Sequence, residues 1–272
     1  MPEFARFREL FAHPWPIIGM ISLPPLPGSP NTPGMDTLLA AALADLAALE
    51  RGGAAAVLIE NDFDQPQTLT VGPEVVAALT LITREVVARA SVPVGIQVLL
   101  NDWRASLAIA RMTSARFVRL DFFVDRVRIK AGEIFPEPEA ITAYRETIGA
   151  THVALLTDLQ VKYSELLESG KTLAESARQA AAAGATAVIV TGDATGVPVA
   201  AADLRAARIG GVPVVIGSGL TPENAPVLLP FADGAIVGTA LRSGNGPLDR
   251  VDEARVRRLV EVCRAATHNP LA

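Results

Sequence analysis

The chain has 272 residues, 50% of them hydrophobic, and a formal net charge of −5. The acidic balance argues against a nucleic-acid partner, which would need a basic face, and the single cysteine, Cys263, excludes an intrachain disulfide. No run approaches the ~20 apolar residues of a membrane helix. The N-terminal segment carries acids and does not resemble a signal peptide, so we expect a cytoplasmic protein without a membrane partner.

The length suits one α/β barrel, which typically needs roughly 250 residues, and the sequence shows no linker. We therefore expect a single domain over residues 1–272, with residues 1–15 as a helical N-terminal extension. Phe4, Phe7, Leu10 and Phe11 have helical spacing. This short helix would either cover the floor of the barrel or form a subunit contact, which leaves a homo-oligomer open.

Eight apolar runs rich in Val, Ile, Leu and Ala alternate with helical patterns along the chain. The runs predict strands at residues 17–23, 55–60, 94–100, 117–123, 152–159, 187–191, 212–216 and 235–237. The helices are expected at residues 36–52, 72–86, 102–112, 138–148, 172–184, 201–208, from 221 onward, and at 252–267. Uninterrupted apolar runs are typical of parallel strands buried on both faces. The alternation predicts a (β/α)8 TIM barrel.

A doubly wound open sheet would also alternate strands and helices, but the first strand is not followed by a G-x-G-x-x-G phosphate loop. Four helix starts have specific signals. Asp36 and Asp102 can each cap a helix, and Thr172 with Glu175 has capping-box spacing. Thr221-Pro222-Glu223 predicts a helix start with a hydroxyl cap and Pro at the first position. Residues 124–137 are expected to form a long connection.

Small residues follow the last two predicted strands: Gly217-Ser218-Gly219 and Gly238-Thr239. In TIM barrels the loops after strands 7 and 8 frequently bind a phosphate through backbone N–H groups. The glycines could also serve only as tight turns, but two such loops on consecutive strands favour phosphate binding. Gly192, in Thr191-Gly192, or alternatively Thr195-Gly196, would supplement the site from the preceding strand.

Polar residues gather at the carboxyl ends of the other strands, where barrel enzymes place their chemistry. The candidates for catalysis are Glu60, Asn101, Asp121, Asp158 and Lys162. Buried charge is destabilising unless it is paired or has a function, so the group as a whole favours a site.

The period of two along a strand orients these residues. It places Arg119 and Asp121 on one side of their strand and makes Asp121 the candidate partner of Arg119. If the next strand stays extended, Asp158, Gln160 and Lys162 share one side too.

Lys162 has two alternative roles. Neighbouring carboxylates would keep it charged, so that it polarises a substrate oxygen while Asp158 or Asp121 moves the proton. Burial without them would make it a base or a Schiff-base nucleophile. No histidine pair has metal-ligand spacing, which argues against zinc, while Mg²⁺ held by Glu60, Asp121 or Asp158 is compatible with the pattern. The cofactor is otherwise unknown.

Several motifs resemble the BtpA/SgcQ family. The most specific is the opening run from Ile17 to Pro30, IIGMISLPPLPGSP. The other matching motifs are Ile59-Glu60-Asn61, Val71-Gly72-Pro73-Glu74, Asn101-Asp102, Val161-Lys162, Val190-Thr191-Gly192, Gly217-Ser218-Gly219-Leu220-Thr221-Pro222-Glu223-Asn224 and Asp233-Gly234-Ala235-Ile236-Val237-Gly238-Thr239. The chain departs from the family's usual motifs at Gln97, Leu100, Asp121 and Tyr163.

This resemblance implies a ribulose-phosphate-binding type of barrel. The family is named for a photosystem I biogenesis factor of cyanobacteria, and some members lie beside genes of sugar metabolism. One hypothesis is therefore an enzyme that acts on a small phosphorylated metabolite, a sugar or nucleotide phosphate, by lyase, isomerase or glycosyl-bond chemistry. The alternative is a non-catalytic assembly or stability factor of the photosystem I biogenesis type. A carbohydrate hydrolase would need two carboxylates that flank a sugar.

Overall fold

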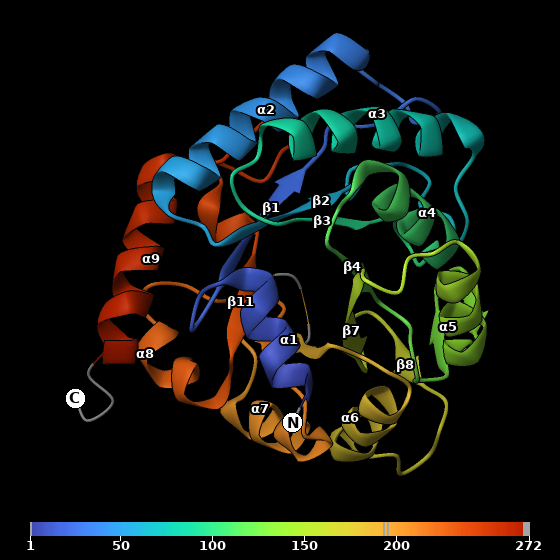
Figure 1. Cartoon of the computed structure of the whole chain (residues 1–272), viewed down its shortest axis with the longest axis vertical. Coiled ribbons are helices and arrows are strands. Elements are labelled where there is room, and N and C mark those ends of the chain that lie inside the picture. The colour runs from blue at the N-terminus through green and yellow to red at the C-terminus, as the bar shows by residue number, and fades with distance from the viewer. Residues whose placement is uncertain (1, 193, 195, 269–272) are drawn as a thin grey trace.

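The computed structural model describes residues 2–192, 194 and 196–268. Within them, eight parallel strands close a barrel in the order β1-β11-β10-β9-β7-β4-β3-β2 (Figure 1). The strands are β1 Ile17–Ser22, β2 Ala56–Glu60, β3 Val94–Gln97, β4 Phe117–Leu120, β7 Ala154–Leu159, β9 Ala187–Val190, β10 Val214–Ile216 and β11 Gly234–Val237. The predicted TIM barrel is confirmed.

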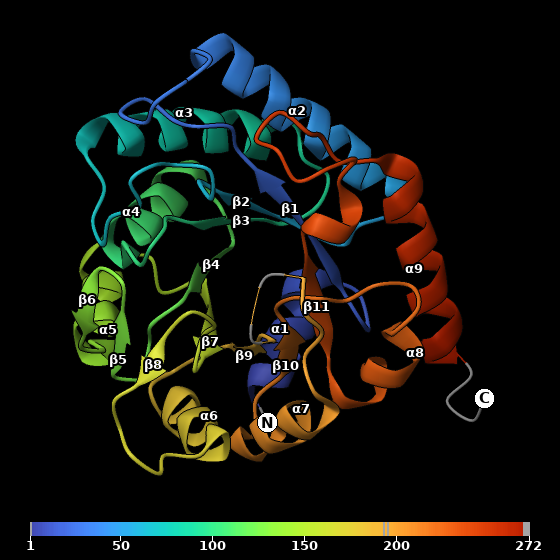
Figure 2. The ribbon, with the colours of Figure 1, turned by 180° about the vertical axis from the view of Figure 1, so that it is seen from behind.

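Helices cover the outside of the barrel on all sides, as the two opposite views show (Figure 2). They are α2 Met35–Gly52, α3 Pro73–Arg89, α4 Trp103–Thr113, α5 Pro138–Thr147, α6 Leu173–Ala182, α7 Ala201–Ala207, α8 Ala225–Leu228 and α9 Glu253–His268, with 3-10 turns η1 Arg208–Gly210, η2 Leu229–Phe231 and η3 Thr239–Leu241. No helix in the described part of the chain is long and apolar enough to cross a membrane.

The capping signals differ in outcome. Thr172 and Glu175 form the predicted capping box, and the Asp102 side chain accepts a hydrogen bond from the Ala105 N–H at 2.9 Å. The predicted cap at Asp36 is wrong. The N-cap position of α2 is Gly34, with φ 88°, so Asp36 falls inside the first turn. There it can still interact favourably with the positive end of the helix dipole.

The predicted helix start at Thr221-Pro222-Glu223 is also wrong, because α8 begins only at Ala225 and is four residues long. The side chain of Asn224 explains the delay. Its Oδ1 accepts from the Thr221 N–H and its Nδ2 donates to the Gly219 carbonyl, each at 2.8 Å. Local side-chain bonds of this kind compete with the helical pattern and close the loop instead.

Helix α1 Pro2–Phe11 closes the floor of the barrel, the first of the two roles expected for it (Figure 1). Phe7 and Phe11 are buried and stack edge-to-face, with ring centroids 4.8 Å apart. Phe11 in turn meets Phe117 of β4 at 5.5 Å. These rings belong to the apolar cluster of inward-facing strand residues, so the lower barrel is a packed core and only the opposite end is hollow.

A small antiparallel sheet lies beside the barrel mouth, where the sequence predicts only a long connection. It consists of β5 Val127–Ile129, β6 Gly132–Ile134 and β8 Glu165–Leu166, in the order β6-β5-β8. We call it the flap. Its apolar side buries Val127 and Ile134 against Phe122 and Val161, which fixes the flap to the loops after β4 and β7.

Candidate active site

The carboxyl ends of the strands surround a cavity of about 960 Å³. One wall is formed by small residues of the loops after β10 and β11, and the other by charged and polar side chains of β2, β3 and β4. The closed strand order places β10 and β11 diametrically opposite β3 and β4. A ligand in the cavity would therefore have a glycine-rich wall at one end and a charged wall at the other.

Three carboxyl groups of the charged wall have raised pKa values. Burial raises the pKa of Glu60 to about 8, and the charge of Asp62 adds to this, while Arg119 and Lys162 oppose it. Burial and then the charge of Asp158 raise the pKa of Asp121 to about 7. Burial raises the pKa of Asp62 to about 6. At neutral pH, Glu60 is therefore mainly protonated and Asp121 can both take up and release a proton.

Arg119 is held mainly by Asp158, and the pairing with Asp121 expected from the period of two is present only as a longer contact. Its Nε and Nη2 donate to Asp158 Oδ2 and Oδ1 at 2.8 and 2.9 Å, whereas Asp121 Oδ1 lies 4.0 Å from Nε. Adjacent β4 and β7 bring the pair together. Because both Asp158 oxygens are occupied and the residue does not line the cavity, it positions Arg119 instead of moving a proton.

Lys162 reaches the cavity by a different path from the one expected. Strand β7 ends at Leu159, and Gln160 has φ 43°, so the chain does not stay extended. The Gln160 side chain turns outward and donates to the Ser176 hydroxyl at 3.1 Å. Lys162 nevertheless lines the cavity, and its charge lowers the pKa of both Glu60 and Asp121.

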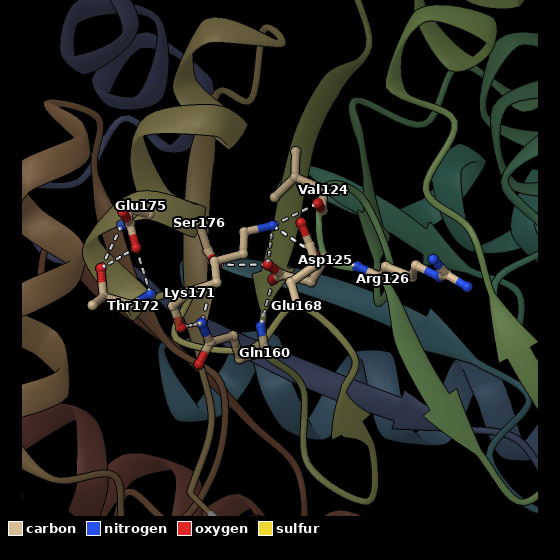
Figure 3. A network of polar contacts seen from close by, with 9 residues as sticks. All are labelled: Val124, Asp125, Arg126, Gln160, Glu168, Lys171, Thr172, Glu175 and Ser176. Atoms are coloured by element: carbon tan, nitrogen blue, oxygen red, sulfur yellow. Dashed lines mark hydrogen bonds and ion pairs between the residues drawn. The ribbon is translucent and has the colours of Figure 1, made fainter.

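A buried polar network holds this loop against the base of the flap (Figure 3). Asp125 is at its centre, 3% exposed, and accepts from the Gln160 N–H at 2.8 Å and from the Ser176 hydroxyl at 2.5 Å. Lys171 Nζ lies 2.9 Å from Asp125, from Glu168 and from the carbonyl of Val124. Since these residues come from the segments after β4 and β7, the network fixes the backbone that carries Lys162.

Two predicted site residues have structural partners instead of facing the cavity. Asn101 Nδ2 donates to the Phe122 carbonyl at 3.1 Å, and its Oδ1 accepts from the Phe122 N–H at 3.2 Å. These two bonds order the segment after β4. The Gly192 N–H donates to Ser218 Oγ at 3.0 Å, and a Cβ on Gly192 would lie 2.4 Å from the Val197 carbonyl oxygen. Gly192 is therefore needed for close packing of these loops.

The remaining phosphate-binding candidates do line the cavity: Gly217, Ser218, Gly219, Gly238 and Thr239. Gly196 also lines it, while Thr195 and Asp193 lie outside the described residues.

Three other residues that line the cavity, Asp62, Gln97 and Arg242, were not among the predicted site residues. Gln97 Nε2 donates to Asp121 Oδ1 at 2.7 Å. Arg242 is 5% exposed and is anchored through Nη2 to the carbonyls of Gly246 and Asp249 at 2.6 and 2.7 Å. Burial lowers its pKa, and the charge of Asp62 opposes the shift. The sequence signal that could have indicated Arg242 is its position shortly after Gly238-Thr239, the second predicted phosphate loop.

The donor set does not support the Mg²⁺ site that the pattern allows. Among the described residues, no group of three His, Cys, Asp or Glu side chains could hold a metal ion. Of the expected ligands, Asp158 gives both oxygens to Arg119, and the Arg119 guanidinium also lowers the pKa of Glu60 and Asp121. The candidate chemistry is therefore that of the carboxyl groups and cations themselves.

The raised pKa of Glu60 predicts how stability depends on pH. Between pH 4.5 and 8 the unfolded chain releases this proton and the native state keeps it, so Glu60 makes the free energy of unfolding fall as pH rises. Glu60→Gln should remove this contribution. Its stability relative to the wild type should rise across that interval in urea titrations, while Glu146→Gln, on the exposed face of α5, should follow the wild type. A constant difference between Glu60→Gln and wild type would contradict the buried, protonated carboxyl.

Residues 13–265 match the sequence model of the BtpA family. An uncharacterized protein of Archaeoglobus fulgidus is 37% identical over 256 residues, 91% of this chain and 98% of that protein. The Photosystem I biogenesis protein BtpA of Synechocystis is 32% identical over 250 residues, 90% of this chain and 87% of that protein.

Among solved structures, an archaeal fructose 1,6-bisphosphate aldolase superposes with a TM-score of 0.60 at 15% identity, over 97% of this chain and 99% of that one. The thiamine phosphate pyrophosphorylase of Pyrococcus furiosus has a TM-score of 0.56 at 14% identity, over 92% of this chain and 96% of that one. At these identities the likeness concerns the fold.

Proposed function

The chain belongs to the BtpA family, and from this premise we propose that it is an enzyme that binds a small phosphorylated metabolite in the barrel mouth and acts on it by proton transfer. The observation that carries the proposal is the division of the cavity. Two carboxyl groups with pKa values of about 8 and about 7 face loops made of small residues across the mouth. Perturbed carboxyl groups in a cleft are typical of catalytic sites.

The phosphate would lie against the loops after β10 and β11. Gly219 and Gly238 expose backbone there, and no side chain at these positions would keep a phosphate oxygen away. The two solved barrels compared above are named for phosphate esters, thiamine phosphate and fructose 1,6-bisphosphate. Their names agree with a phosphorylated ligand in this fold. Arg242, at the end of the β11 loop, adds a positive charge near this wall.

The opposite end of the substrate would meet Glu60, Asp121 and Lys162. Protonated Glu60 can donate a proton to a substrate oxygen, and Asp121 can accept one from a carbon or hydroxyl. The Lys162 ammonium stabilises negative charge on the oxygen during the transfer. Arg119, which Asp158 fixes in the cavity wall, adds a second positive charge. This arrangement serves isomerase or lyase chemistry and also protonation of a glycosidic leaving group.

A non-catalytic assembly factor is the second candidate, and the name of the Synechocystis relative supports it. Such a factor would not require raised carboxyl pKa values beside a glycine-lined cavity. The two functions differ in whether a phosphorylated small molecule binds in the barrel mouth.

The variant Gly238→Ala tests the phosphate site. Gly238 has a negative φ, −117°, and the nearest atom to the new Cβ would be Sδ of the flexible Met20 side chain, at 2.9 Å. We expect the affinity for inorganic phosphate in calorimetry to fall about 10–100-fold, since one or two charge-assisted hydrogen bonds are lost. Gly219→Val is a poorer test. Gly219 has φ +71° and its Cβ would lie 2.3 Å from the Val197 carbonyl oxygen, so the loop itself would change.

Ala143→Val, which adds bulk on the exposed face of α5, should bind phosphate like the wild type. Unchanged affinity in Gly238→Ala would place the anion site elsewhere. No binding of inorganic phosphate or of any phosphate ester to the wild type would favour the assembly factor.

A further inference from the structure

We infer that the charged wall contains a subsite for two neighbouring hydroxyl groups, formed by Glu60 and Gln97, and that the substrate is therefore a sugar phosphate with a vicinal diol. The inference rests on the proposed function and deepens it. It assigns the part of the substrate that lies against β2 and β3.

Two buried side-chain oxygens of this wall lack a partner. Glu60 Oε2 and Gln97 Oε1 accept no hydrogen bond from any residue that the structure describes. Their residues are only 6% and 2% exposed, and both line the cavity. Gln97 cannot simply turn its oxygen away, because its Nε2 is held by Asp121 Oδ1 at 2.7 Å. A buried polar atom without a partner is unfavourable, so a ligand that supplies one is stabilised there.

The strand register puts the two residues side by side. Glu60 and Gln97 are Cα partners in the parallel β2–β3 ladder, and adjacent strands lie about 4.8 Å apart. Two such oxygens on neighbouring strands suit two hydroxyl groups on adjacent carbon atoms. Asp62 Oδ1, which also lacks a partner among the described residues, lies just beyond the end of β2.

The hydrogen-bonding chemistry of the site favours hydroxyl groups over an ammonium group. Arg119 and Lys162 act on Glu60 and would repel a cation, which offsets the attraction of Asp62 and Asp121. A hydroxyl group is neutral and can both donate and accept, so it satisfies the Glu60 carboxyl in either protonation state. An ammonium group can only donate, and a keto or ether oxygen can only accept.

Pairs of sugar phosphates that differ by one hydroxyl test the subsite. Calorimetry would compare ribose 5-phosphate with 2-deoxyribose 5-phosphate, and glucose 6-phosphate with 2-deoxyglucose 6-phosphate, with inorganic phosphate as the reference ligand. We expect the wild type to prefer the hydroxylated member of at least one pair by about tenfold or more, because the deoxy compound leaves a buried acceptor unpaired. Gln97→Met and Glu60→Met, which remove the polar atoms, should each reduce that preference to about threefold or less while binding inorganic phosphate like the wild type.

Gln179→Met and Glu146→Met, both on exposed helix faces, are the matched controls and should keep the preference. If Gln97→Met is unfolded by circular dichroism, Glu60→Met alone decides. Equal affinity of the wild type for both members of each pair would overturn the subsite, as would a preference that survives in the variants. Binding of inorganic phosphate without binding of any of the sugar phosphates would overturn the diol and leave the proposed function standing. No binding of either would overturn both.

Discussion

Replacing Asp158 by asparagine should lower the free energy of unfolding by about 3–5 kcal/mol, because it leaves the Arg119 guanidinium buried without its carboxylate. The Asp158 side chain is 0% exposed and that of Arg119 is 6% exposed. Both Asp158 oxygens accept from Arg119. Asp121 can replace it only in part, since its Oδ1 is 4.0 Å from Arg119 Nε, although loss of the Asp158 charge removes one of the causes that raise the Asp121 pKa. Urea denaturation at neutral pH measures the change.

Two variants show whether the cause is the unpaired charge. Asp203→Asn, on the exposed face of α7, should change stability by no more than about 0.5 kcal/mol. The double change Arg119→Met with Asp158→Leu removes both charges and should recover most of the loss, as replacement of buried ion pairs by apolar residues often does. Wild-type stability in Asp158→Asn would show that Asp158 does not anchor Arg119.

Lys162→Met should reduce turnover of the substrate about 10²–10³-fold, the usual cost of removing one group that stabilises developing negative charge. The melting temperature should hardly change, because Lys162 is partly exposed at the cavity wall and its loop is fixed by the Asp125 network. A second readout needs no substrate. Since the Lys162 charge lowers the pKa of Glu60 and Asp121, both pKa values should rise in the variant, as measured by NMR of the carboxyl carbons.

Arg178→Met, an exposed cation on α6, is the matched control and should leave turnover and both pKa values unchanged. Full activity in Lys162→Met would remove Lys162 from the chemistry, and with it the role of the loop after β7. A loss of activity together with a large fall in melting temperature would show a structural role instead.

The barrel itself could be predicted because each of its strands is a continuous apolar run that is followed by a helical pattern. The flap could not, since β5, β6 and β8 are only two or three residues long and carry exposed charged residues such as Arg128, Glu133 and Glu165. The flap also depends on pairing between β5 and β8, which are far apart in sequence. Short, half-exposed strands leave no apolar run to detect.

The site could be predicted as a ring of residues but not as a set of contacts. Glu60, Asp121 and Lys162 do line one cavity. The partner of Arg119 was missed because the nearest carboxylate in sequence, Asp121, differs from the nearest one in space, Asp158 on the adjacent strand. The turn at Gln160 depends on a positive φ that its residue type does not indicate. Strand periodicity thus selects the face of a residue, while the neighbouring strand decides its partner.

A crystal structure of the protein soaked with inorganic phosphate tests the central claim most directly. The account predicts one bound phosphate in the cavity, between the loops that contain Gly217, Ser218 and Gly219 on one side and Gly238 and Thr239 on the other, within hydrogen-bond distance of backbone N–H groups. A phosphate bound only outside these loops, or a cavity without bound phosphate at saturating concentration, would contradict it.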